Sequence, residues 1–227
     1  GGGLCVLTET ITSPTLGNQL DTLLKAFPEM RWYQYEPDNR DNVRAGAVMA
    51  FGEPVNTYYD FKKADVVVTL DADFANSGPG STRYAYDFAS RRDIASGNKT
   101  MNRLYAVETT PTATGSIADH RIALGTAEIE QFALSLAQAL GVDVTHTEQS
   151  DKHEWLNPLV RDLENHKGAS AVVVGAQQSA VVHALAHAIN ARLGNVGITV
   201  HYTAPLESQS VDQAEGLRYL VADMAAG

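Results

Sequence analysis

The run ADVVVTL at residues 64–70 constrains the fold most, because it is apolar at positions that face both sides of a strand. A strand with this pattern is buried on both faces, as the central strand of a parallel sheet is. Other short β-branched runs alternate with segments of helical periodicity along the chain. We therefore predict an α/β fold with Rossmann-like parallel sheets and helices on both faces.

The expected elements follow from these patterns and from the residues at their boundaries. Ser13 is a typical helix N-cap, and Pro14 suits the first helical position, where its missing N–H costs nothing. Strands are expected at residues 4–8, 31–36, 64–70, 103–107, 171–174 and 198–202. Helices are expected at residues 14–27, 41–51, 81–92, 126–140, 180–193 and 211–224. Apolar residues at helical spacing predict one buried face for the first of these helices: Leu16, Leu20, Leu23, Leu24 and Phe27.

A polar stretch suggests how the chain is divided. Residues 145–158, which end in Pro158, are expected to form a linker. Residues 1–144 then form one α/β lobe, and residues 159–227 form a second α/β portion packed on it. The start at Gly1, on the approach to the first expected strand, indicates a piece of a longer protein.

Composition excludes several classes of protein. The 227 residues include 27 acidic and 17 basic side chains, which give a formal charge of −10. An acidic chain without clustered Lys and Arg is not expected to bind nucleic acid or an anionic membrane. No apolar run is long enough for direct insertion into a membrane. Cys5 is the single cysteine, which excludes an intramolecular disulfide, a four-cysteine iron–sulfur cluster and a cysteine-rich zinc site.

Two carboxylates follow the apolar strand, at the sheet edge where open α/β proteins bind ligands. Asp71 and Asp73 could hold Mg²⁺ and supply a nucleophile, as in a haloacid-dehalogenase-like phosphotransferase. That family has Thr or Val four residues after the first Asp, where this chain has Ala75. The favoured interpretation is that both carboxylates cap the loop at residues 78–80.

A second strand end offers weaker signals. Gly175, with Gln177 and Ser179 opening a helix, could receive an anion on backbone N–H groups. The segment is neither G-x-G-x-x-G nor a P-loop, and it lacks G-x-S-x-G, so a helix cap is favoured for Ser179. His183 and His187 have zinc-ligand spacing but no third ligand, so packed or surface histidines are favoured.

Three segments resemble the molybdopterin oxidoreductases, the formate dehydrogenase and dimethyl sulfoxide reductase group. Residues 101–124 resemble that family's D-P-R-x-T-x-T-A-x-x-A-D segment, residues 64–74 its A-D-hhhhh-G-x-N-P strand and loop, and residues 186–200 its helix ending in G-N-I-G-R-P. The resemblance implies a formate dehydrogenase/DMSO reductase domain-like fold. It also places the following residues around a vestigial cofactor pocket: Asp71, Asp73, Glu108, Thr110, Thr112, Thr114, Gly175, Gln177, Ser179 and Asn195.

One branch of the family is more similar still: the large iron–sulfur subunit of alternative complex III, a quinol-oxidising respiratory complex. Residues 32–52, 78–92 and 114–121 look like its N-terminal region, which is understood to hold no molybdenum cofactor. This resemblance implies a peripheral protein on the periplasmic side of the bacterial inner membrane, exported by a twin-arginine signal. Its partners would be other subunits and a ferredoxin-like region, outside this chain, that carries the iron–sulfur clusters.

Three residues depart from the family pattern in a way that changes the charge of the expected cofactor pocket. Asp71 stands where the family has glycine, Asp73 where it has asparagine, and Thr110 where it has arginine. Two added anions and one lost cation oppose a diphosphate by Coulomb repulsion. The first hypothesis is therefore a non-catalytic scaffold domain without a cofactor, catalytic residue or metal ligand. The alternatives are an oxidoreductase fragment that binds molybdopterin guanine dinucleotide and a Mg-dependent phosphotransferase using Asp71 and Asp73.

Overall fold

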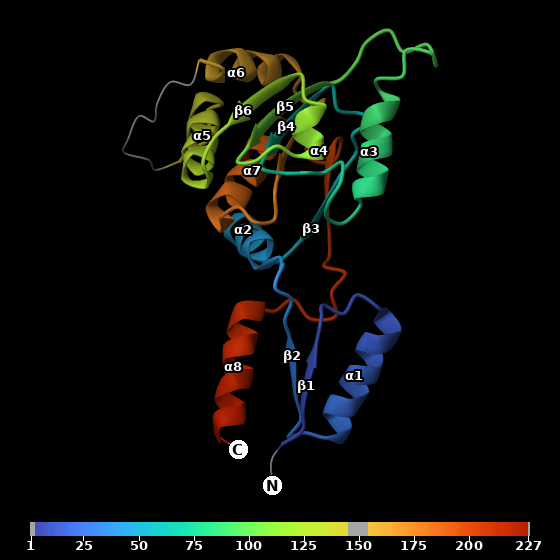
Figure 1. The fold of residues 1–227 in the computed structure, drawn as a ribbon, viewed down its shortest axis with the longest axis vertical. Coiled ribbons are helices and arrows are strands. Elements are labelled where there is room, and N and C mark those ends of the chain that lie inside the picture. The colour runs from blue at the N-terminus through green and yellow to red at the C-terminus, as the bar shows by residue number, and fades with distance from the viewer. Residues whose placement is uncertain (1–2, 145–153, 227) are drawn as a thin grey trace.

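The computed structural model describes residues 3–144 and 154–226. Figure 1 shows a larger lobe, built around a sheet covered by helices, and a smaller lobe formed by β1, α1, β2 and α8. In chain order the elements are β1 (Cys5–Thr8), α1 (Pro14–Ala26), β2 (Arg31–Gln34), α2 (Asp41–Phe51), β3 (Asn56–Tyr59), β4 (Val66–Leu70), α3 (Ser81–Ser90), β5 (Arg103–Glu108), α4 (Ala113–Ser116), β6 (His120–Ala123), α5 (Thr126–Ala139), α6 (Leu156–Asn165), β7 (Ser170–Val174), α7 (Ala180–Arg192), β8 (Val200–Thr203) and α8 (Gln213–Ala226).

The larger lobe contains a four-stranded parallel sheet in the order β6-β5-β4-β7. All five residues of β4 are buried, as the sequence predicts for a central strand. Alternate residues of β4 enter two separate cores. Val66, Val68 and Leu70 pack with α5, α6 and α7, whereas Val67 packs with Phe88 of α3 on the opposite face. The predicted α/β class, with a parallel sheet and helices on both faces, is confirmed.

The open edge of β7 is closed by asparagine side chains instead of another strand. Asn190 of α7 donates from Nδ2 to the carbonyl of Val172 and accepts from the Val172 N–H at Oδ1, at 2.9 and 3.0 Å. Asn195 accepts from the side chain of Ser170 at 3.1 Å. Both asparagines are buried, so these amides replace the hydrogen bonds that a neighbouring strand would make.

The smaller lobe is a parallel β1–β2 pair with α1 and α8 beside it. Asp41, the first residue of α2, links it to the larger lobe by accepting from the N–H groups of Gln213 and Ala214 at the start of α8. The prediction that α1 has one buried face is wrong. Leu20 is buried, but Leu16, Leu23 and Phe27 are exposed. Two strands offer too little surface to cover that face.

The structure differs from the sequence analysis at the expected linker and at several helices and strands. Residues 145–153 lie outside the described residues, and residues 156–158 open α6. The chain after the linker forms no separate sheet, because β7 pairs with β4 and α8 returns to β2. Strands β3 and β6 and helices α4 and α6 are not predicted from the sequence. Strand β8 pairs antiparallel with β3 in a sheet of its own. Among the described residues, no helix has the length and apolar character to cross a membrane.

Replacing Asn190 with leucine tests how the β7 edge is closed. The substitution leaves the N–H and carbonyl of Val172 unpaired in the core, so we expect the free energy of unfolding to fall by about 3 kcal/mol. Urea unfolding followed by circular dichroism measures this change. Asn165→Leu, at an exposed position of α6, is the matched control and is expected to change stability little. Equal stability of the two variants would contradict the role assigned to Asn190.

Candidate functional site

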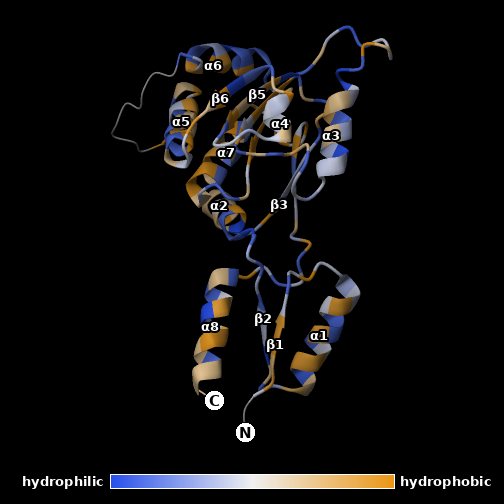
Figure 2. Cartoon of the chain, in the orientation of Figure 1, coloured by the Kyte–Doolittle hydropathy of each residue, from blue (hydrophilic) through white to orange (hydrophobic). Residues whose placement is uncertain are grey.

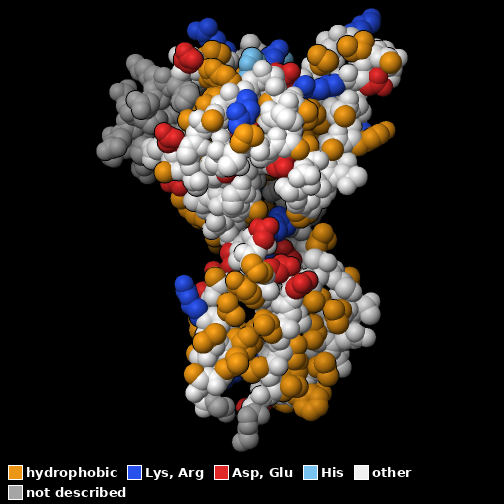
Figure 3. Space-filling model, viewed as in Figure 1, with side chains coloured by type: hydrophobic (Ala, Val, Ile, Leu, Met, Phe, Trp, Pro, Cys, Tyr) orange, Lys and Arg blue, Asp and Glu red, His pale blue; other side chains and the backbone are white. Residues whose placement is uncertain are grey.

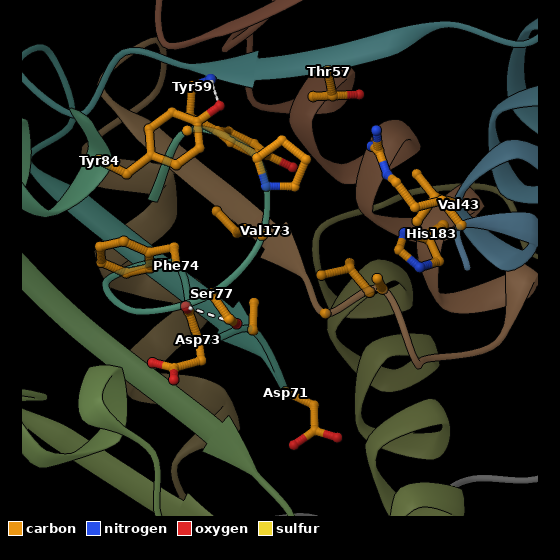
Figure 4. A pocket seen from close by; sticks show the side chains of 18 of the residues that line it. Val43, Thr57, Tyr59, Asp71, Asp73, Phe74, Ser77, Tyr84, Val173 and His183 are labelled. Atoms are coloured by element: carbon orange, nitrogen blue, oxygen red, sulfur yellow. Dashed lines mark hydrogen bonds between the residues drawn. The ribbon is translucent and has the colours of Figure 1, made fainter. Parts of the chain in front are cut away.

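A cavity of about 530 Å³ lies at the carboxyl ends of β4, β5 and β7, the position that the sheet topology favours for a ligand. Strand β3, helices α2 and α7 and the loop before α3 complete its walls. Figure 4 shows Phe74, Tyr59 and Tyr84 on one wall and Val43 and His183 on the other.

Asp71 joins the ends of three strands at the floor of the cavity. Its backbone is in the left-handed region (φ 57°), and its N–H donates to the carbonyl of Val107 at 2.7 Å. The carboxylate accepts from the N–H of Thr109 at 2.9 Å and from Nε2 of Gln178 at 2.9 Å. Gln177 donates to the Asp71 carbonyl at 2.7 Å. Asp71 thus fixes the ends of β4, β5 and β7 relative to one another.

Gly175 is needed because β7 passes so close to Asp71. A Cβ at this position would lie 2.0 Å from the Asp71 carbonyl oxygen. The N–H of Gly175 donates to the carbonyl of Leu70 at 2.9 Å and continues the sheet. The glycine therefore lets the backbone of β7 approach the backbone of Asp71 closely. Its N–H bonds to Leu70 and is not free to bind an anion.

Asp73 and Glu108 organise the neighbouring loops. Asp73 accepts at Oδ1 from the N–H and hydroxyl of Thr114, at 2.9 and 2.8 Å, and at Oδ2 from Asn76. Glu108 is buried, accepts from the Thr112 hydroxyl at 2.7 Å and pairs with Arg121. Figure 4 shows the carboxylates of Asp71 and Asp73 pointing away from Tyr59 and His183. These partners lie outside residues 78–80, so the two carboxylates hold other loops than the one expected from the sequence. Because donors of the chain itself occupy both carboxylates, their arrangement gives no support to a magnesium site.

The structure brings six of the ten sequence-predicted pocket residues to the cavity lining. These are Asp71, Asp73, Thr110, Thr112, Gly175 and Gln177. Glu108 and Thr114 are buried and bond to residues of that lining. Ser179 caps α7 and donates to Glu130, whereas Asn195 supports the edge of β7, so neither lines the cavity.

Four other residues of the cavity lining are not predicted by the sequence analysis. Tyr58, Tyr59 and Tyr84 come from β3 and α3, and Arg40 precedes α2. Burial raises the pKa of the Tyr59 hydroxyl, and Tyr84 accepts from the Tyr59 N–H at 3.3 Å. The signal in the sequence is the pair Tyr58 and Tyr59, but only the fold places β3 opposite the ends of β4 and β7.

His183 and His187 line the cavity as buried, neutral side chains. Burial lowers the pKa of each imidazole to about 4, with smaller contributions from His187 and Arg40 in the case of His183. His187 Nδ1 lies 3.1 Å from the Tyr202 hydroxyl. Within residues 3–144 and 154–226, no three His, Cys, Asp or Glu side chains are grouped so as to hold a metal ion. The packed-histidine interpretation agrees with these positions.

Comparison with known proteins does not place the chain in a family: no family model and no curated protein matches it. The resemblance to the molybdopterin oxidoreductases therefore stays a prediction from the residues quoted above. The cavity and the surface of the molecule are the remaining indications of function.

Gly175→Ala tests the close approach between β7 and Asp71. The added methyl group would overlap the Asp71 carbonyl, so we expect the free energy of unfolding to fall by about 3 kcal/mol. Gly216→Ala in α8 is the matched control, since its Cβ would lie 3.5 Å from the nearest atom, the Gln34 carbonyl oxygen. Helix propensity predicts a neutral or slightly stabilising effect for the control. Equal unfolding midpoints in urea would refute the steric argument.

The buried histidines predict a pH-dependent stability. Both are neutral in the folded protein down to a pH of about 4, whereas a histidine in the unfolded chain takes up a proton near pH 6.5. Protons therefore bind preferentially to the unfolded state below pH 6.5, and the free energy of unfolding falls as the pH drops. The loss reaches on the order of 3 kcal/mol per histidine near pH 4.

Urea unfolding between pH 7 and pH 4 measures this slope. The double variant His183→Gln, His187→Gln is expected to flatten it, while His201→Gln, at a part-exposed position, leaves it unchanged. A double variant with the slope of the unmodified protein would rule out the two buried imidazoles as its source.

Proposed function

We propose that the chain is a non-catalytic, molybdopterin-oxidoreductase-like scaffold domain of a quinol-oxidising respiratory complex, similar to the iron–sulfur subunit of alternative complex III. In this proposal the fold is of the formate dehydrogenase/DMSO reductase type. The domain acts through contacts with neighbouring subunits and holds no cofactor itself.

The observation that carries the proposal is the exposed apolar surface of the smaller lobe. Parallel strands are normally buried on both faces, yet Leu7 of β1 is 51% exposed. Phe27, which follows α1, is 54% exposed, and Met224 of α8 is 73% exposed. Figures 2 and 3 show hydrophobic residues spread over this lobe. A surface of this kind is typical of a contact with another protein chain.

The charges around the cavity support a domain without the family's cofactor. Asp38, Asp71 and Asp73 all line it, and Thr110 stands where the family has an arginine. A diphosphate in the cavity would lie in the field of three carboxylates, and hydrogen-bond donors at the strand ends already bond within the chain. The same interactions leave little support for a magnesium-dependent phosphotransferase.

The remaining parts of the proposal follow from the family resemblance. The partners are the ferredoxin-like iron–sulfur region and other subunits of a membrane-bound complex. The location is the periplasmic side of the bacterial inner membrane, where the domain would be peripheral after twin-arginine export. The exposed face of the smaller lobe is the surface that we assign to these partners.

Elemental and pterin analysis of the natural protein tests the absence of a cofactor. The protein is purified from its own host in mild detergent, assayed for Mo, W and Fe, and denatured for pterin fluorescence. We expect iron and quinol oxidation in the purified complex, without Mo, W or pterin. One molybdopterin guanine dinucleotide per chain would instead support the cofactor-binding oxidoreductase. Magnesium-dependent hydrolysis of p-nitrophenyl phosphate, lost in Asp71→Asn, would support the phosphotransferase.

Assembly is tested in the same preparation. Replacing Leu7 and Phe27 with serine is expected to release the chain from the complex, because both apolar side chains would be covered there. Ile94→Ser, at a 69% exposed position of the larger lobe, is the control and is expected to leave assembly intact. Retention of the double variant at the level of the control would contradict the assigned surface.

A further inference from the structure

One cation on the cavity wall, Arg40, has only a long ion pair and no hydrogen bond to its guanidinium in the described part of the chain. Among the described residues, the guanidinium of Arg40 makes no hydrogen bond, and its closest carboxylate oxygen, Oε1 of Glu207, lies 3.9 Å from Nη1. Its side chain is 33% exposed and lines the cavity. Arg83 also lines the cavity, but its Nε donates to Asp87 at 3.3 Å. Arg40 can therefore bind an anion without giving up an existing hydrogen bond.

The ring of His183 also lines the cavity. The residue is 6% exposed. Its Nε2 is inaccessible to solvent and makes no hydrogen bond in the described structure. Close packing of α2 on α7 fixes the position of the ring, since a Cβ on Gly46 would lie 2.3 Å from the His183 Cβ. Water does not reach this nitrogen, so the ring contributes to the cavity as a fixed, apolar part of its wall.

The opposite wall is aromatic. Phe74, Tyr59 and Tyr84 face the side that carries Val43 and His183 (Figure 4). Phe74 and Tyr84 each pack against Phe61, with ring centroids 4.6 and 5.2 Å apart, so the aromatic wall is held rigidly. A flat, apolar group can pack its face against such a wall.

We propose that this cavity binds a small organic monocarboxylate with a planar, largely apolar body. The carboxylate pairs with Arg40, and the body lies between the aromatic wall and the side that carries Val43 and His183. A single negative charge is favoured because Asp38, Asp71 and Asp73 line the same cavity and would oppose a polyanion. The volume of about 530 Å³ lies within the usual range for small-molecule sites. This inference is independent of the scaffold function.

Calorimetric titration with 2-naphthoate tests the site, with 2-naphthamide as the uncharged probe and pyrophosphate as the polyanion. We expect saturable one-to-one binding of 2-naphthoate, at least about tenfold tighter than binding of 2-naphthamide, because a hydrogen-bonded charge pair is lost in the amide. Arg40→Gln is expected to weaken binding of 2-naphthoate about tenfold. The matched control Arg83→Gln removes the same charge from the lining and is expected to change affinity less than about twofold.

Nitrogen chemical shifts of the histidine rings locate the bound probe. Addition of 2-naphthoate is expected to shift the signals of His183 and His187, and to leave those of His166 and His201, which do not line the cavity, in place. Circular dichroism establishes that each variant is folded. The proposal is overturned if 2-naphthoate does not bind saturably, if Arg40→Gln binds it as tightly as the unmodified protein does, or if pyrophosphate displaces it.

Discussion

The carboxyl ends of β4, β5 and β7 are held together by the hydrogen bonds of one buried residue, Asp71. Through its side chain and backbone it links the end of β4 to Val107 and Thr109 after β5 and to Gln177 and Gln178 after β7. Each of these segments would otherwise present unpaired polar groups at the base of a cavity. The carboxylate therefore has a structural role: it holds the strand ends that form the floor of the cavity.

The two lobes differ in how far their apolar side chains are buried. In the larger lobe the parallel sheet has a core on each face, and asparagine amides close the edge of β7. In the smaller lobe the β1–β2 pair is parallel as well, but much of the apolar surface around it is exposed. The contrast explains why we assign chemistry of small molecules to the larger lobe and contacts between chains to the smaller one.

The parts of the site that could be predicted from the sequence are those at the ends of strands. Asp71, Asp73 and Gly175 each follow an apolar run, and parallel strands bring their carboxyl ends to one edge. Arg40 and Tyr59 could not be placed in this way. They reach the cavity because β3 pairs with β8, almost 150 residues later, and because α2 packs on α7. Neither contact leaves a local pattern in the chain.

The sequence by itself determined the α/β class, the central position of β4 and most of the element boundaries, since these depend on local periodicity, capping and burial of consecutive residues. Only the tertiary structure decided what the polar residues do. The same aspartate can bind a metal or cap a loop, and the outcome depends on which donors surround it. For Asp71 those donors come from Thr109 and Gln178, brought to it by strand pairing across the sheet. The same holds for α1, whose apolar stripe predicts burial but lies exposed because the adjoining sheet has two strands.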